Sequence, residues 1–182
     1  MAGYLGNIPT AVPLTSADIA DGIITSAKIA DGTIVNADIN ASAGIVGTKL
    51  GAGALLQVVY ATDSTNRSTT STSFVTASNT LSVSITPSSA SNKIWIHCDF
   101  GTENVINYGY ATLFRDATNI GDSSFGFMII DLSNAQQSFS VLDSPSTTSA
   151  ITYQVYIRSN SSTTSINNQG NVGTITAFEI KG

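Results

Sequence analysis

The sequence predicts an all-β protein, an antiparallel β-sandwich of the jelly-roll type preceded by an extended N-terminal arm and a short repeat segment. Two observations carry this prediction. In residues 51–182, apolar and polar side chains alternate in short runs spaced roughly 8–12 residues apart, which is typical of a sandwich or barrel. Residues 15–50 instead contain a ten-residue repeat with few large side chains. We therefore divide the chain into an arm (1–14), a repeat segment (15–50) and a β domain (51–182).

The composition excludes several classes of protein. Of the 182 residues 42% are hydrophobic and only 10% are charged, with a net charge of −5, against about 25% charged in a typical soluble domain. Seven basic residues are too few for a nucleic-acid binder, which neutralises phosphates with Lys and Arg. Glu occurs only twice, which excludes a coiled coil, and no apolar run reaches the length of a membrane span.

The first 14 residues have no periodicity and contain Pro9 and Pro13, which favours an extended arm. They lack a basic segment followed by an apolar core, so no secretory signal peptide is predicted. The repeat begins directly afterwards. Residues 15–24 and 25–34 are identical at eight of ten positions, the first copy being Thr-Ser-Ala-Asp-Ile-Ala-Asp-Gly-Ile-Ile. A decayed copy follows at 35–40.

Two local structures fit this repeat. Ser16 and Ser26 could cap a helical turn that Gly22 and Gly32 terminate, or Asp-Gly could mark a tight turn between extended pieces. In both cases one copy cannot bury the regularly spaced isoleucines, and such repeats become stable when several chains share an axis. The predicted core of this shared stalk consists of Ile19, Ile24, Ile29, Ile34 and Ile39.

The β domain is expected to contain about nine strands. Clear alternation occurs at 81–86, 93–100, 151–158 and 174–180, and further strands are expected at 55–62, 72–77, 105–115, 125–132 and 136–142. Pro, Asn, Asp and Ser clusters at 87–89, 116–119, 144–146 and 167–170 separate them as turns. Ser and Thr make up roughly a quarter of the chain, so the outward faces are neutral, a property of strands that other copies often cover.

The residues needed for catalysis are missing. His97 is the only histidine and Cys98 the only cysteine, and neighbours in a strand point to opposite faces. No nucleophile elbow, phosphate loop or zinc-ligand set occurs, so we predict no enzyme activity, no cofactor and no metal. Asp99 and Glu103 could pair as in a glycosidase, but a solvated strand end explains them better.

Three aromatic residues could stack on a sugar: Trp95, Tyr108 and Tyr110. Core or subunit-interface packing is the stronger interpretation of all three. We therefore treat them only as candidate glycan contacts.

Several segments resemble a known class of protein. The opening Tyr-Leu-Gly-Asn-Ile-Pro at 4–9 and the repeat Thr-Ser-Ala-Lys-Ile-Ala-Asp-Gly-Thr-Ile resemble phage tail-fibre and related virion proteins, especially those of marine and cyanobacterial phages. The β domain resembles a domain of phage structural proteins in three places. These are residues 81–94, Thr-Leu-Phe-Arg at 112–115 with Asn-Ile-Gly at 119–121, and Asp-Ser-Pro at 143–145 with Thr152 and Tyr153.

The resemblance implies a homotrimer with a β-rich distal domain and an N-terminal segment that docks on the particle, with Tyr4, Leu5, Ile8 and Pro9 as candidate docking residues. It implies a virion protein made in the host cytoplasm, whose partners are its own copies, other virion proteins and a host surface glycan. We expect a short tail or collar fibre. Because 36 repeat residues at about 3.6 Å each cannot form a long shaft, a capsid cement or decoration protein is the alternative.

Overall fold

A computed structural model describes residues 15, 17, 19–40, 42–46, 49–104, 106–131 and 134–182. The chain forms two compact units, Met1–Ile45 and Val46–Gly182, so the division falls close to the boundary expected at residue 50. The predicted docking residues Tyr4, Leu5, Ile8 and Pro9 lie outside the described residues.

The backbone of the repeat segment recurs every ten residues. Short 3-10 helices occupy Ser26–Lys28 (η2) and Asn36–Asp38 (η3). A β-turn precedes each of them: Ile23 N donates to Ala20 O (3.2 Å) before η2, and Thr33 N donates to Ala30 O (3.1 Å) before η3. Gly22 and Gly32, with φ of +75° and +77°, hold the left-handed position of these turns, which favours glycine. The unit thus combines both local structures that fit its sequence.

The structure corrects one detail of this segment. Ser26 was a candidate helix cap, but it lies inside η2, and Thr25 occupies the cap position without a side-chain cap hydrogen bond. The isoleucines expected in a shared stalk lie at the surface of the single chain. Ile19, Ile24, Ile34 and Ile39 are exposed, and Ile29 is half-buried. This segment therefore buries little apolar surface within one chain.

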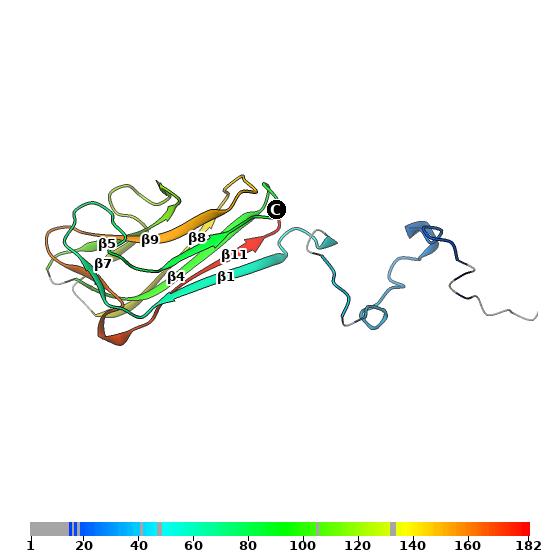
Figure 1. The fold of residues 1–182 in the computed structure, drawn as a ribbon, viewed down its shortest axis with the longest axis horizontal. Coiled ribbons are helices and arrows are strands. Elements are labelled where there is room, and N and C mark those ends of the chain that lie inside the picture. The colour runs from blue at the N-terminus through cyan, green and yellow to red at the C-terminus, as the bar shows by residue number, and fades with distance from the viewer. Residues whose placement is uncertain are drawn as a thin grey trace, which may run out of the picture. The chain divides into compact units, whose positions relative to one another are not determined.

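The second unit is all-β and consists of two antiparallel sheets packed face to face (Figure 1). Sheet A contains six strands: β1 (Leu55–Asp63), β2 (Arg67–Thr69), β4 (Lys93–Asn104), β8 (Ala135–Asp143), β10 (Thr164–Ile166) and β11 (Gly173–Ile180). Sheet B contains five: β3 (Ser82–Ile85), β5 (Gly109–Arg115), β6 (Thr118–Asn119), β7 (Met128–Ile130) and β9 (Ile151–Ser159).

The long strand β4 organises sheet A. Its residues 93–99 pair with β11 and residues 102–104 pair with β10 along the same edge, while β8 pairs with the opposite edge. The order across the main part of the sheet is therefore β1–β11–β4–β8 (Figure 1). Beyond β11, β10 pairs with β4 and β2 pairs with β10. In sheet B, β3, β9 and β5 follow one another, and β5 carries β6 and β7 on its outer edge.

Successive main strands alternate between the two sheets, which is the connectivity of a jelly roll. The core between the sheets contains the inward side chains of the alternating runs, including Leu81, Ile96, Phe100, Leu113 and Ile157, all at most 1% exposed. The sequence prediction of an all-β sandwich is confirmed. The alternation fixed these elements because each sheet buries one face only.

Three predicted strands are wrong in extent. Within 72–77 only Val75 is paired, through an isolated bridge to Ile157, because left-handed Ala77 and Ser78 turn the chain away. The strand expected at 105–115 begins at Gly109, and that expected at 125–132 is limited to Met128–Ile130. The short strands β2, β6 and β10 were not predicted, because two or three mostly polar residues carry no alternation and their pairing is set by neighbouring strands.

Candidate functional site

Four apolar side chains form a row across the outer face of sheet A. Val58 of β1 lies opposite Phe178 of β11, Phe178 lies opposite Trp95 of β4, and Trp95 lies opposite Leu142 of β8. The rings of Trp95 and Phe178 stack with centroids 5.0 Å apart and an angle of 29°. We call these four residues the apolar row. It runs through four consecutive strands without a polar interruption.

The row arises from alternation on four separate strands. Inward neighbours such as Ile96 and Ala177 fill the core, so Trp95 and Phe178 must point outward. Val58, Trp95 and Leu142 keep 46%, 40% and 55% of their surface exposed. Direct cross-strand pairing places these side chains in contact and stabilises the sheet by roughly 0.2–1 kcal/mol per pair.

The next row of the same face is mixed. It consists of Tyr60, Thr176, His97 and Ser140, in strand order β1, β11, β4 and β8. Tyr60 is 74% exposed, and His97 Nδ1 lies 3.0 Å from Ser140 Oγ. Neither row contains a carboxylate. The charged positions of β4 on this face, Lys93 and Asp99, flank the two rows at either end.

His97 and Cys98 point to opposite faces of sheet A. Cys98 is fully buried in the core, where burial raises the pKa of its thiol far above the ordinary value. His97 lies on the outer face with Trp95, their ring centroids 6.2 Å apart. The two side chains cannot act as a nucleophile and its base, because the sheet separates them.

Asp99 and Glu103 do not form a catalytic carboxylate pair. Four residues along one extended strand separate the two positions by about 13 Å, more than the spacing of glycosidase carboxylates. Asp99 accepts a hydrogen bond from Gln136, and Glu103 accepts one from Asn168 Nδ2 (3.4 Å). Across the described part of the chain, no three His, Cys, Asp or Glu side chains gather as metal ligands would.

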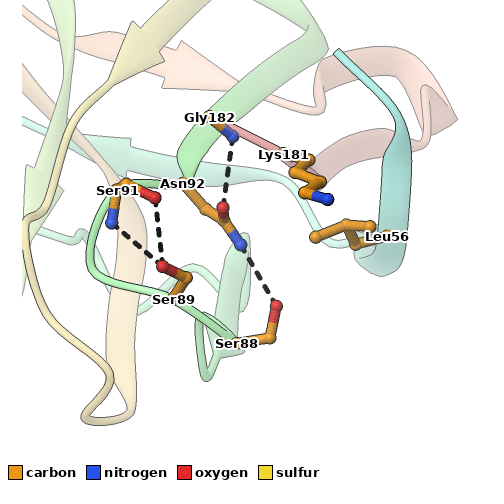
Figure 2. A pocket seen from close by; sticks show the side chains of 7 residues that line it. All are labelled: Leu56, Ser88, Ser89, Ser91, Asn92, Lys181 and Gly182. Carbon is orange, nitrogen blue, oxygen red and sulfur yellow. Dashed lines mark hydrogen bonds between the residues drawn. The ribbon is translucent and has the colours of Figure 1, made fainter. Parts of the chain in front are cut away.

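A hollow of about 180 Å³ lies beside the chain's last residues (Figure 2). Its lining consists of Leu56, Ser88, Ser89, Ser91, Asn92, Lys181 and Gly182. Figure 2 shows the Asn92 side chain at its centre: the oxygen accepts from Gly182 N (3.2 Å) and the nitrogen donates to Ser88 Oγ (3.1 Å). Asn92 is thus bonded to Ser88 and Gly182 within the lining, whereas Lys181 Nζ donates to Leu50 O outside it.

Glu179 lies next to this hollow and is 1% exposed. Its Oε1 accepts from Ser88 N (2.6 Å), Ser88 Oγ (2.8 Å) and Asn92 Nδ2 (2.6 Å), and its Oε2 accepts from Gln57 Nε2 (2.6 Å). Burial by itself would raise the pKa of this carboxyl, but hydrogen bonds from Asn92, Gln57 and Ser88 outweigh it and hold the pKa below its ordinary value. A carboxylate with these partners fastens the loop at 87–92 to β1 and β11.

A second polar group joins the two sheets. Arg115 Nη1 donates to both carboxylate oxygens of Asp143 (2.9 and 2.8 Å), and Tyr153 Oη donates to Asp143 Oδ2 (2.6 Å). Burial and the neighbouring Asp143 raise the pKa of Tyr153, so its hydroxyl remains protonated and donates. Since β5 and β9 belong to sheet B and β8 to sheet A, this group ties one sheet to the other.

The structure separates the three candidate glycan contacts. Trp95 lies in the apolar row of sheet A, whereas Tyr110 belongs to β5 of sheet B and is only 7% exposed. Phe125 packs against the Tyr110 ring (5.6 Å), and the Arg158 guanidinium lies 4.4 Å from its centroid. Tyr108 is exposed just before β5. The three residues therefore do not build one aromatic surface.

Sequence reasoning did not select Tyr60, Phe178 or Leu142, which share the outer face of sheet A with Trp95. The signal was present, because all three occupy the outward phase of predicted strands. Alternation does not reveal which strands become neighbours, so the row could not be assembled from the sequence.

Comparison with known proteins adds no family assignment: no family model matches this chain, and no curated protein matches it. Among the described residues, no helix is long and apolar enough to cross a membrane.

Proposed function

We propose that this chain is a non-enzymatic structural protein of a bacteriophage virion, a short tail or collar fibre. In this proposal the arm docks on a tail or portal protein, three copies share the repeat segment as a stalk, and the β domain faces outward toward a host surface glycan. The protein is made in the host cytoplasm and functions in the virion. The resemblance of the arm and repeat to phage fibre proteins supports this assignment.

The repeat segment is the observation that carries the proposal. Its backbone repeats every ten residues, yet Ile24 and Ile34 are 55% and 53% exposed in one chain. Regularly spaced isoleucines that one chain leaves in water become buried when equivalent segments of several copies pack around an axis. A stalk of this kind is the role that best accounts for them.

The β domain supports a structural role. Glu179 and the Asp143 cluster are engaged in fastening loops and sheets. The domain exposes an apolar sheet face, which is a surface for contact. Contact is what an attachment protein requires.

One observation favours a second function, that of a capsid cement or decoration protein. The β-turns at 20–23 and 30–33 make the repeat segment shorter than an extended chain of the same length. A stalk this short suits a protein seated directly on the shell. In that case residues 1–14 would bind the major capsid protein, and the added interface area would stabilise the head.

Copy number in purified virions tests and separates the two functions. Quantitative mass spectrometry against the major capsid protein should give a few tens of copies or fewer for a tail or collar fibre. Hundreds of copies would assign the protein to the capsid lattice. Absence from purified particles would overturn both.

The shared stalk can be tested by replacing Ile19, Ile29 and Ile39 together with Ser. We expect the triple variant to assemble less stably, because about 1.5–3 kcal/mol is lost for each isoleucine that assembly would bury, while the far-UV circular dichroism of the β domain stays unchanged. Sedimentation equilibrium measures the assembly. An unchanged mass and midpoint of dissociation would show that the isoleucines do not form a shared core.

A further inference from the structure

The outer face of sheet A carries an apolar surface that the β domain leaves open. Besides the apolar row it exposes Leu55 and Tyr60, and Ile180 lies half-buried beside them. Together these side chains present on the order of several hundred Å², the size at which an apolar patch marks an interaction site. We call this surface, residues 55, 58, 60, 95, 142, 178 and 180, the apolar face.

We propose that the apolar face is the contact through which the β domains of separate copies of this chain pack against one another. The inference deepens the proposed function, because it assigns a surface to the contact between the copies that the proposed homotrimer contains. It is independent of the stalk, which belongs to the other unit of the chain.

Charge favours a second copy as the occupant. The chain carries a net charge of −5, so most faces of two copies would repel each other. The apolar row and the row of Tyr60 and His97 beside it contain no carboxylate. Two copies can therefore meet here and bury apolar surface without burying like charges.

The dimensions of the face also fit a contact between copies. Four strands spaced by about 4.8 Å and nine residues of about 3.4 Å each give a face of about 19 by 31 Å. The side chains standing on this plane bring its accessible area toward the roughly 800 Å² per partner of a standard interface. On one side the apolar rows are bordered by Ser140, Ser138 and Thr174, small polar residues of the kind found in an interface rim.

A sugar fits this face less well than a protein does. A glycan needs hydrogen-bonding groups beside the aromatic ring, but His97 lies within hydrogen-bond distance of Ser140, and Asp99 is bonded to Gln136. The side chains that border Trp95 and Phe178 along the row are the aliphatic Val58 and Leu142. An aromatic pair that is flanked by aliphatic side chains favours burial against another apolar surface.

The test compares two lysine substitutions in the full-length chain. Leu142→Lys places a charge in the apolar row, and the control Ile129→Lys places one on β7 of sheet B at a position of equal exposure, 55%. Tyr60→Lys, at the most exposed position of the face, is a second variant that the isolated fold should tolerate. Far-UV circular dichroism and thermal melting confirm that each variant is folded.

Two readouts follow. Sedimentation gives the assembly mass, and acrylamide quenching of Trp95, the only tryptophan, reports whether the face is covered. We expect wild type and Ile129→Lys to be oligomeric with Trp95 shielded. Leu142→Lys and Tyr60→Lys should weaken association at least tenfold, or, if the stalk keeps the copies together, should expose Trp95 to the quencher.

Two results would overturn the proposal. One is a monomeric wild type, in which case protection of Trp95 by added host polysaccharide would assign the face to a glycan instead. The other is an oligomer whose mass and Trp95 quenching are the same in Leu142→Lys and Ile129→Lys. Since both measurements use purified protein, neither result bears on whether the chain is present in virions, which copy number decides separately.

Discussion

The two outer faces of the sandwich carry similar numbers of aromatic rings, but the rings differ in how other parts of the chain pack on them. On sheet B, Phe114 and Tyr156 stack on each other with centroids 3.9 Å apart, and Tyr110 lies beneath Phe125 and Arg158. On sheet A, Trp95 and Phe178 stack on each other, and no described loop of the β domain buries Trp95 or Leu142. The chain covers Tyr110 of sheet B with Arg158 and a loop and leaves Trp95 of sheet A open.

Arg158 is central to the covered face. Its guanidinium lies over Tyr110 and Phe74, and its Nε donates to Ser124 O (2.9 Å) and Nη1 to Thr72 O (3.3 Å). These bonds hold the loops at 72–74 and 124–125 against the sheet. The difference teaches that an aromatic side chain in the outward phase of a strand indicates a contact surface only where no loop of the same chain packs on it.

The same contrast exists within sheet A between two consecutive residues. Phe178 faces the open side, whereas Glu179 faces inward and has four hydrogen-bond donors around it. Because the inward side chains of sheet A pack within the same chain, substitutions at these positions should destabilise the fold. Changes on the open side should leave the isolated fold stable and alter only what it contacts.

The largest effect is expected for Glu179→Gln. The new amide group presents N–H to donors that need an acceptor, so one buried donor loses its partner, at a cost of about 1–3 kcal/mol. Chemical denaturation measures this loss. The control is Glu103→Gln, at the only other glutamate, which accepts one long hydrogen bond and should lose less than about 0.5 kcal/mol. An equal loss of unfolding free energy in both variants would mean that the hydrogen bonds around Glu179 do not stabilise the fold.

The pH dependence sharpens this prediction. The pKa of Glu179 is held below its ordinary value of 4.5, so its ionised form stabilises the fold fully above that pH and the stabilisation is lost as the pH falls through the lowered pKa. Asp63 behaves alike: burial alone would raise its pKa, but bonds from Thr80, Thr65 and Arg67 lower it. We expect stability to decline below about pH 4 and to decline less steeply in Glu179→Gln. If the stability of wild type and Glu179→Gln declined equally with falling pH, Glu179 would not contribute to the acid sensitivity of the fold.

An intermediate effect is expected for Arg158→Ala on sheet B. The variant loses the contacts with Tyr110 and Phe74 and the partly exposed hydrogen bonds to Ser124 and Thr72, which together amount to about 1 kcal/mol. Thermal denaturation and hydrogen exchange at 122–126 report the change, since this loop should exchange faster. If the loop keeps its protection, Arg158 does not hold it in place.

The smallest effect is expected for Tyr60→Ala on sheet A. Its side chain is 74% exposed, so removing it should change the free energy of unfolding of dissociated chains by less than about 0.5 kcal/mol. The measurement is chemical denaturation at concentrations at which the protein is monomeric. If Tyr60→Ala lost as much stability as Arg158→Ala, Tyr60 would contribute to the fold of the single chain, and the contrast between the two faces would be wrong.

The sequence was a good guide to the strands that carry strict alternation. The strands at 93–104, 151–159 and 173–180 and the inward placement of Cys98 follow from it, because alternation separates a buried face from an exposed one. The strand predicted at 72–77 is wrong in extent, and the short strands β2 and β10 could not be predicted. Their pairing depends on which edge of β4 or β9 was still open.

The candidate surface was predicted only in part. Trp95 was selected for its aromatic ring, but Tyr110, selected on the same ground, is covered by Arg158 and Phe125. Tyr60, Phe178 and Leu142 were not selected, because they come from β1, β11 and β8, which are distant in sequence and become neighbours only through pairing with one another and with β4.

By itself, then, the sequence determined the all-β class, the ten-residue repeat and the inward or outward phase of β4 and β9, because these depend on local side-chain periodicity. The tertiary structure alone decided the sheet order and the register. These brought four outward residues into one apolar row and brought Arg158 over the aromatic rings of the opposite sheet. Register and coverage are properties of long-range pairing, which no local pattern encodes.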